Sequence, residues 1–312
     1  IADVDAYETF IGHRSQFPKA EAQVVDHPHL LSQPEQVRPD RRPDESGPSS
    51  DDHAFMHAAK VGLPREAVPA SFAARMLVSI VLPCYNAEAF LDRSLGALFA
   101  QTHRPLELIA VDDGSTDGTL RLLEDAVARA PFPMTVLKQA NAGACAARNR
   151  GLKLAQGEYV QFMDADDALL PEKVAVHVQA ALMAGSPEIV VGASRTYGAD
   201  GALKWTDAQE PVDRDPWLDL ARHRLGGTPN NLWKRTAPLE AGGWDEHMRS
   251  SQGDDLLFRL LQRGARVTHV SAMLTEVHLQ GTGSISTQRL DLTWKRFIEL
   301  RVRIIEHLRT EQ

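Results

Sequence analysis

From Met76 onward the chain alternates short runs of β-branched and aliphatic residues with longer segments of helical period. This alternation predicts strands that alternate with helices, and therefore a mixed, mostly parallel α/β sheet flanked by helices. The predicted strands cover 77–82, 106–111, 135–139, 159–163 and 188–191, and the predicted helices cover 86–101, 119–129, 143–155 and 171–184. A domain of about 235 residues is large enough to bury a substantial core.

The first 75 residues have a different composition. They hold 8 of the 18 prolines and 5 of the 12 histidines. Such a stretch buries too little apolar surface to repay the entropy of ordering the chain, so we predict a flexible segment or linker over 1–75. Because the chain begins with Ile1 rather than Met, we expect it to be a fragment or a processed piece.

Charge and cysteine content exclude several classes of protein. Lys plus Arg number 34 and Asp plus Glu number 42, which gives a net charge of -8 and no general positive field for nucleic acid. Cys84 and Cys145 lack the Cys-x-x-Cys spacing of zinc and redox sites, and they suggest reduced thiols in a cytoplasmic protein. The longest apolar runs are far shorter than the roughly 20 residues that cross a bilayer, so no transmembrane helix is predicted.

Polar residues follow three of the predicted strands. The first strand ends in Pro83-Cys-Tyr-Asn86, the second in Asp112-Asp-Gly-Ser-Thr-Asp117 and the fourth in Asp164-Ala-Asp-Asp167. A single Asp-Gly-Ser is ordinary turn chemistry. Three such ends on one sheet favour a ligand site, because ligands of open parallel sheets bind outside the carboxyl ends of the strands.

The residue types at these ends suggest a nucleotide with a metal-bridged diphosphate. Asp164 and Asp166 can bind a hard divalent cation that takes its remaining ligands from water and phosphate. Tyr85 offers a ring for stacking, and Asp113 offers an acceptor for a pyrimidine N–H. Neither Gly-x-x-x-x-Gly-Lys-Ser/Thr nor Gly-x-Gly-x-x-Gly occurs, which disfavours a P-loop NTPase and a dinucleotide dehydrogenase.

Four blocks in order resemble glycosyltransferase family 2. They are Val78-Ser-Ile-Val-Leu-Pro-Cys-Tyr-Asn86, Leu108-Ile-Ala-Val-Asp-Asp-Gly-Ser-Thr-Asp117, Asn141-Ala-Gly-Ala-Cys-Ala-Ala-Arg-Asn-Arg-Gly151 and Tyr159-Val-Gln-Phe-Met-Asp-Ala-Asp-Asp167. The resemblance extends over roughly 76–286. It implies a GT-A fold with a Rossmann-like sheet, a nucleotide-sugar donor and inversion at the anomeric carbon.

The resemblance also assigns roles to individual residues. Asp164 and Asp166 would form the Asp-x-Asp motif that holds Mg²⁺ or Mn²⁺, with Asp167 as an alternative member and His278 as a late histidine that reaches the metal or the diphosphate. The donor site would consist of Pro83, Tyr85, Asn86, Asp112, Asp113, Arg148, Asp164 and Ala165.

An inverting transfer also needs a general base for the acceptor hydroxyl. Gly253-Asp-Asp-Leu-Leu-Phe-Arg259 lies where the family carries an acidic pair, so the resemblance implies Asp255 as the base and Asp254 as its neighbour. The alternative is that both carboxylates only complement a helix dipole. The departure from the family's Glu at position 254 leaves the division of roles between the two open.

A second set of residues falls where the family shapes its sugar pocket. Trp244 and Asn231 are the candidates, from Gly242-Gly-Trp-Asp-Glu246 and Gly226-Gly-Thr-Pro-Asn-Asn-Leu-Trp233. Trp244 could stack on an apolar sugar face, or it could be a hydrophobic plug.

Residues 289–309 have helical period, with apolar and basic residues interleaved. Such a helix could lie on a membrane surface, but packing onto the domain or a dimer contact is favoured. The predicted organisation is thus a segment over 1–75, a catalytic domain over 76–288 and an amphipathic helix over 289–312.

We therefore predict an inverting, metal-assisted transferase that moves one sugar from a UDP-sugar to a glycan or lipid-linked acceptor. The predicted setting is envelope polysaccharide biosynthesis in the cytoplasm, with peripheral contact at the inner face of the membrane. The Gln-x-x-Arg-Trp motif of processive synthases does not occur, which favours single addition. The alternative is an inactive module that binds nucleotide sugars and recruits a partner.

Overall fold

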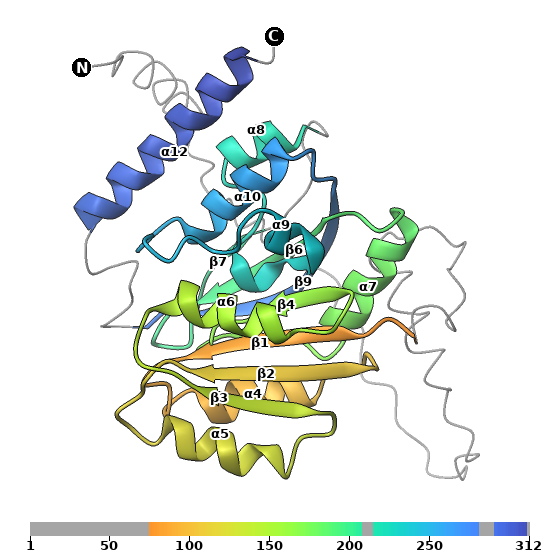
Figure 1. The fold of residues 1–312 in the computed structure, drawn as a ribbon, viewed down its shortest axis with the longest axis vertical. Coiled ribbons are helices and arrows are strands. Elements are labelled where there is room, and N and C mark those ends of the chain that lie inside the picture. Colours follow the sequence, from red (N-terminus) through yellow and green to blue (C-terminus); the bar gives the residue numbers. More distant parts are fainter. Residues whose placement is uncertain (1–74, 208–214, 281–289, 311–312) are drawn as a thin grey trace, which may run out of the picture. The chain divides into compact units, whose positions relative to one another are not determined.

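The computed structural model describes residues 75–207, 215–280 and 290–310, with side chains from 295 onward in the last range. The predicted N-terminal segment, apart from Arg75, lies outside the described residues. The N-terminal half alternates strands and helices as expected (Figure 1). Its elements are β1 (Val78–Cys84), α4 (Leu91–Phe99), β2 (Leu106–Asp112), α5 (Thr119–Val127), β3 (Met134–Lys138), α6 (Ala144–Leu154), β4 (Tyr159–Phe162), β5 (Ala168–Leu169) and α7 (Lys173–Met183).

The C-terminal half is less regular. Its elements are β6 (Ile189–Tyr197), β7 (Leu203–Asp207), α8 (Pro216–Ala221), the 3₁₀ helix η1 (Thr228–Asn230), β8 (Leu232–Lys234), α9 (Thr236–Glu240), α10 (Gln252–Gln262), β9 (Val267–His278) and α12 (Leu290–Thr310). The sequence did not predict β7, β8 or β9, and it ended β6 six residues early.

One mixed sheet of nine strands runs through both halves, in the order β3-β2-β1-β4-β8-β6-β9-β5 with β7 paired to β6. The first four strands are parallel. Cys84 pairs with Asp112, and the backbone N–H of Met163 donates to the carbonyl of Val81. The carboxyl ends of β2, β1 and β4 therefore lie side by side, which confirms the mixed α/β sheet and brings the three polar strand ends to one edge.

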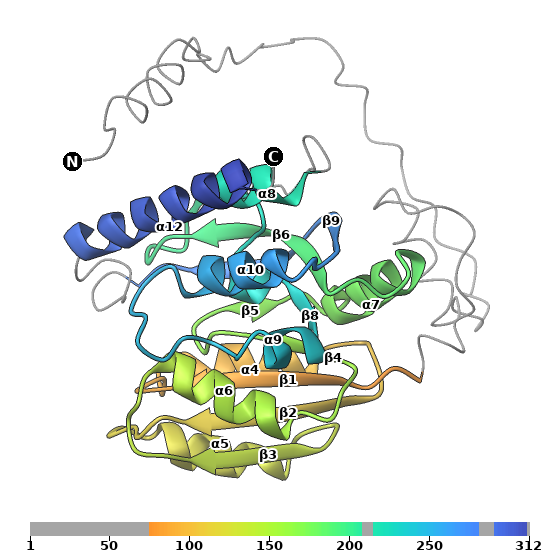
Figure 2. The ribbon, with the colours of Figure 1, turned by 45° about the horizontal axis from the view of Figure 1, so that its top comes forward.

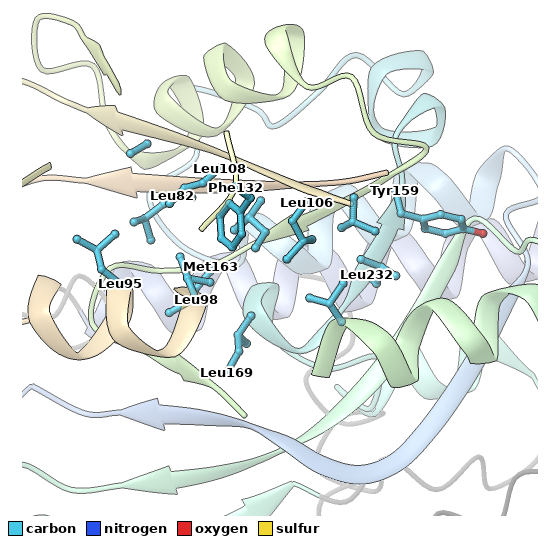
Figure 3. Close-up of a cluster of buried hydrophobic side chains, with 14 of the residues drawn as sticks. Leu82, Leu95, Leu98, Leu106, Leu108, Phe132, Tyr159, Met163, Leu169 and Leu232 are labelled. Atoms are coloured by element: carbon cyan, nitrogen blue, oxygen red, sulfur yellow. The ribbon is translucent and has the colours of Figure 1, made fainter. Parts of the chain in front are cut away.

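Alternate residues of the parallel strands point to opposite faces, and helices cover both faces. Ile80 and Leu82 of β1 belong to a core that includes residues of α4, α5 and α7 (Figure 3). Val81 belongs to a second core with residues of α6, α9 and α10. Figure 2 shows α6 and α4 on opposite sides of β1. Burial on both faces explains why β1 reads as a continuous apolar run.

The helix predicted to begin at Asn86 begins five residues later. Asn86 has a left-handed backbone with φ of 47°. Its backbone N–H donates to Ser115 Oγ, and its Oδ1 accepts from the backbone N–H of Thr116. These bonds tie the loop after β1 to the loop after β2, so Asn86 joins two strand ends instead of capping a helix.

The C-terminal helix packs onto the domain. Leu300 and Ile304 of α12 are buried in the second core, and Arg301 and Arg303 reach acidic residues of α10. Packing onto the domain is the alternative that the sequence favoured. Within the described residues, no helix is both long and apolar enough to cross a lipid bilayer.

Candidate active site

Asp112 and Asp113 end β2, and both are buried. Asp113 accepts hydrogen bonds from the backbone N–H groups of Ala142 and Gly143 and from the side chain of Gln139. Its carboxylate therefore holds the loop before α6 against the sheet. Asp112 is fully buried, and its Oδ2 has no hydrogen-bond partner among the described residues.

The end of β1 contributes one buried residue and one residue that is exposed to solvent. Pro83 is buried within the strand, whereas the Tyr85 ring is 53% exposed. An exposed aromatic ring at the carboxyl edge of a parallel sheet is available for stacking on a planar base.

The acidic run after β4 concentrates negative charge. Burial, and then the charge of Asp164, raises the pKa of the Asp166 carboxyl above its ordinary value. Burial, and then both neighbouring carboxylates, raises the pKa of Asp167 well above its ordinary value. Ala165, which stands between Asp164 and Asp166 in the sequence, is buried. Carboxylates that repel one another in this way form a site that a cation would stabilise.

His278 lies beside this run at the end of β9. Its backbone N–H donates to Asp167 Oδ1, and its ring stacks on Tyr197 with centroids 5.4 Å apart. Burial, reinforced by the charge of Arg93, lowers the pKa of His278. Its Nε2 is buried and has no hydrogen-bond partner among the described residues.

These residues fit a divalent cation that is completed by a bound substrate. No preformed group of three His, Cys, Asp or Glu side chains suited to a metal ion exists in the described part of the chain. Mg²⁺ and related ions are commonly held by one or two carboxylates plus substrate phosphates. Asp164 and Asp166 supply oxygen donors of the right kind, and Nε2 of His278, at the end of β9, supplies a nitrogen donor.

Arg148 of α6 connects the acidic run to α10. One guanidinium nitrogen donates to Asp164 Oδ1 at 2.6 Å, and another donates to Gln252 Oε1 at 2.9 Å. The start of α10 is therefore anchored beside the acidic run. A buried guanidinium beside the acidic run could also contact an anionic ligand.

A cavity of about 270 Å³ opens beside the acidic run. Its wall includes the carboxylates of Asp164 and Asp167, the ring of Trp205, which is 54% exposed, and His223. Its lining consists of Asp164, Asp167, Ser194, Thr196, Trp205, Asp207, His223, Gly227, Thr228, Pro229, Asn230 and Val277.

Sequence reasoning missed Trp205 and His223. Trp205 lies in the apolar and polar alternation of β7, which was the one available signal. His223 stands outside every recognisable motif.

The two acidic residues of α10 point to different places. Asp254 accepts from His223 Nδ1, at 3.1 Å from each carboxylate oxygen, and His223 lines the cavity. Asp255 accepts from Arg259 at 2.8 Å and from Arg303 at 3.1 Å, and it lines a separate cavity of about 230 Å³ beside α12. Both oxygens of Asp255 are thus engaged outside the cavity that Asp164 lines. No acceptor is present to test the expectation that Asp255 is the base, and this role stays a prediction.

The two residues predicted for the sugar pocket are both buried. Trp244 is 1% exposed and contacts Phe162 and Trp233 edge to face, with ring centroids 5.2 and 6.1 Å apart. Asn231 is fully buried and donates to the carbonyl of Leu225. Neither side chain is available to a sugar in this structure. Trp244 is the hydrophobic plug that the sequence left as an alternative, and the adjacent Asn230 lines the cavity instead.

Comparison with known proteins identifies the class to which this fold and site belong. The family model "Glycosyl transferase family 2" matches residues 79–242. This match covers more than half of the chain, and the chain belongs to that family.

Individual relatives agree with this assignment. An uncharacterized glycosyltransferase of Haemophilus influenzae is 29% identical over 188 residues, which cover 60% of this chain and 62% of the relative. Other similar curated proteins are matched over 27% to 39% of their lengths. This chain therefore matches less than two thirds of each of these relatives.

Two solved structures share the fold. S. aureus TarS 1–349, solved in complex with UDP-GlcNAc, has a TM-score of 0.57 at 20% identity, over 68% of this chain and 61% of TarS. The mannosyltransferase PcManGT of Pyrobaculum calidifontis, solved with GDP-Man and Mn²⁺, has a TM-score of 0.51 at 20% identity, over 74% and 65% of the two chains. These likenesses confirm the predicted GT-A fold.

Proposed function

We propose that this chain transfers one sugar from a UDP-sugar to a hydroxyl group of a glycan or lipid-linked acceptor, with inversion at the anomeric carbon. The observation that carries the proposal is the cavity beside the acidic run. It brings Asp164 and Asp167 together with the exposed ring of Trp205 and with His223. Family membership supports the reaction class.

The donor would lie along the carboxyl edge of β1, β2 and β4. The exposed Tyr85 ring would stack on the base, and the carboxylate of Asp113 would accept an N–H from the nucleoside. The diphosphate would then extend toward Asp164 and Arg148. The complexes of TarS with UDP-GlcNAc and of PcManGT with GDP-Man support a nucleotide-sugar donor.

Asp164 and Asp166 would hold Mg²⁺ or Mn²⁺. A bound cation would neutralise the charge that develops on the departing diphosphate. Burial, and then the charge of Asp164, raises the pKa of Asp166. The repulsion between the two carboxylates supports this assignment, because a cation would relieve it.

The acceptor would enter through the mouth of the cavity. The exposed face of Trp205 suits stacking on the apolar face of a pyranose, and Asp207, Ser194 and Thr196 offer polar groups for its hydroxyls. This arrangement supports a saccharide acceptor, as expected for polysaccharide biosynthesis.

We place the protein in the cytoplasm, at the inner face of a membrane that carries lipid-linked acceptors. Ile298, Val302 and Ile305 form a stripe along α12, and all three are exposed. A helix with such a stripe and basic flanks supports peripheral contact with lipid.

The test combines donor binding with nucleotide release. Calorimetry with UDP- and GDP-sugars, with and without Mn²⁺, is expected to show metal-dependent binding of a UDP-sugar. Asp166→Asn should weaken this binding at least tenfold, because it removes one of two proposed cation ligands.

Asp125→Asn is the matched control, because Asp125 is an exposed residue on α5 that pairs with Arg121. It should bind the donor as the wild type does. Equal binding with and without metal, or an unchanged Asp166→Asn variant, would overturn the metal assignment. Binding without any nucleotide release would favour the recruitment module.

A further inference from the structure

Arg259 of α10 holds one oxygen of the Asp255 carboxylate. Its Nε donates to Asp255 Oδ2 at 2.8 Å, across one turn of the helix. Its Nη1 donates to the backbone carbonyls of Ala241 and Gly243, at 2.6 and 2.8 Å. A single guanidinium therefore joins a buried carboxylate to a turn of the backbone, and its planar fork of donors suits this task.

The turn that accepts from Arg259 is anchored to α6. Trp244 follows the turn, and its backbone N–H and carbonyl both bond to the side-chain amide of Asn149, each at 2.8 Å. Arg148, the neighbour of Asn149 in α6, donates to Asp164. Arg259 thus connects the predicted base to the helix that also contacts the acidic run.

The other oxygen of Asp255 has a partner of a different kind. Arg303 of α12 donates to Oδ1 at 3.1 Å, and its side chain is 47% exposed, against 24% for Arg259. Arg303 and Asp255 both line the cavity beside α12, whereas Arg259 lies outside that lining. Long side chains that reach a partner from solvent hold it weakly, so a substrate can replace Arg303 more readily than Arg259.

We propose that Arg259 is the positioning residue of Asp255, which it holds by Oδ2 so that Oδ1 takes the proton of the acceptor hydroxyl. This inference rests on the proposed transfer function and on the predicted role of Asp255 as the base. The first turn of α10 adjoins the cavity proposed for the acceptor, because a Cβ atom at Gly253 would be 3.4 Å from Thr228 Oγ1 on its wall. Arg303 moves aside when the acceptor binds.

In the proposed step, Asp255 Oδ1 accepts the proton of the attacking hydroxyl. The hydroxyl oxygen forms a bond to the anomeric carbon while the bond from that carbon to the diphosphate oxygen breaks, and the electron pair leaves with the nucleoside diphosphate. Arg259 keeps its hydrogen bond to Oδ2, so the carboxylate does not rotate. The proton passes to solvent after the product leaves.

The experiment measures nucleotide release from UDP-GlcNAc and GDP-mannose with Mn²⁺, where water takes the place of the acceptor hydroxyl. Arg259→Gln should lower kcat by about 100-fold, which is the scale of loss when a catalytic group is misplaced by about 1 Å. The KM for the donor should stay within threefold of the wild type, because Arg259 does not line the cavity beside the acidic run. Arg259→Lys keeps the charge but not the fork of donors, so it should lose less rate than Arg259→Gln.

Two further measurements separate positioning from a purely structural role. Arg259→Ala leaves space for a guanidinium ion, so millimolar guanidinium chloride should restore part of the lost rate without raising the melting temperature. In a double-mutant cycle, Asp255→Asn combined with Arg259→Gln should be no slower than Asp255→Asn alone, because Arg259 acts only through that carboxylate.

Arg263→Gln is the matched control. Arg263 directly follows α10, one turn after Arg259, and its exposed side chain pairs with Glu240 at 4.0 Å. This variant should keep the wild-type kcat and KM. All rates are compared below the melting temperature of each variant, and Arg259→Lys takes the place of Arg259→Gln in the double-mutant cycle if the latter does not fold.

Three results would overturn the inference. The first is an Arg259→Gln enzyme within threefold of the wild-type kcat. The second is a double variant in which the two losses multiply, which would make Arg259 act independently of the carboxylate. The third is an Asp255→Asn enzyme with the full rate, which would remove the base on which the inference rests. Absence of nucleotide release by the wild type from either donor would instead count against the proposed function itself.

Discussion

Replacing Trp244 and Trp205 in turn separates a packing residue from a binding residue. Trp244 is 1% exposed, and Arg148 lies over its ring at 4.8 Å in addition to its two aromatic neighbours. Trp205 is 54% exposed on the wall of the cavity. Substitution by alanine should therefore lower the stability of the protein at Trp244 and weaken acceptor binding at Trp205.

The expected cost at Trp244 follows from its burial. A buried Trp removes about 150–250 Å² from water, which at about 25 cal/mol per Å² gives an upper bound of about 4–6 kcal/mol. Substitutions of buried aromatic residues by alanine cost about 3–5 kcal/mol. We therefore expect Trp244→Ala to lower the free energy of unfolding by about 4 kcal/mol. In a domain of this size the melting temperature would fall by about 8–16 °C.

Trp205→Ala should change the free energy of unfolding by less than about 1 kcal/mol, because half of the ring is already in water. It should instead raise the KM for a saccharide acceptor at least tenfold, since the proposed stacking platform is lost. Urea unfolding and initial rates, measured below the melting temperature of each variant, give the two quantities. A stable Trp244→Ala protein with weak acceptor use would refute the assignment of Trp244 to the core.

Three further predictions concern buried ionisable groups. Asp255→Asn should lower the free energy of unfolding by about 3 kcal/mol, because it removes the charged partner of two arginines, and calorimetric melting measures this change. A normal melting temperature together with a loss of about 100-fold in kcat would contradict this structural cost and would support Asp255 as the base. Burial, and then the charge of Lys173, lowers the pKa of His177 well below its ordinary value, so the unfolded state binds one more proton below about pH 6.5. Stability should then fall by up to about 1.4 kcal/mol per pH unit as the pH drops below that value, and urea midpoints of His177→Leu should show a flatter dependence. Burial raises the pKa of Cys145 to about 11, so its native thiol should react with a disulfide reagent at pH 8 about 100-fold more slowly than in urea, and equal rates would contradict its burial.

Much of the parallel half of the fold could be predicted because its information is local. The apolar runs of β1, β2 and β4 and the helical period of α6 and α7 each appear within one short segment, and all five elements formed within a few residues of their predicted bounds. The strands of the C-terminal half could not be predicted in this way. β8 has three residues, and β9 is defined by its long pairing with β6, which depends on contacts distant in sequence.

The sequence by itself determined which strands carry polar ends and that parallel pairing would bring Asp112, Asp164 and Tyr85 to one edge, because strand direction and side-chain period are properties of each segment. Only the tertiary structure decided which tryptophan is buried and which side chains reach each carboxylate of α10. Trp244 and Trp205 differ in what packs over them. His223 and Arg301 reach Asp254, whereas Arg259 and Arg303 reach Asp255. Those neighbours come mainly from β4, β8, α6, α12 and the residues after α8, whose positions are set by packing across the domain.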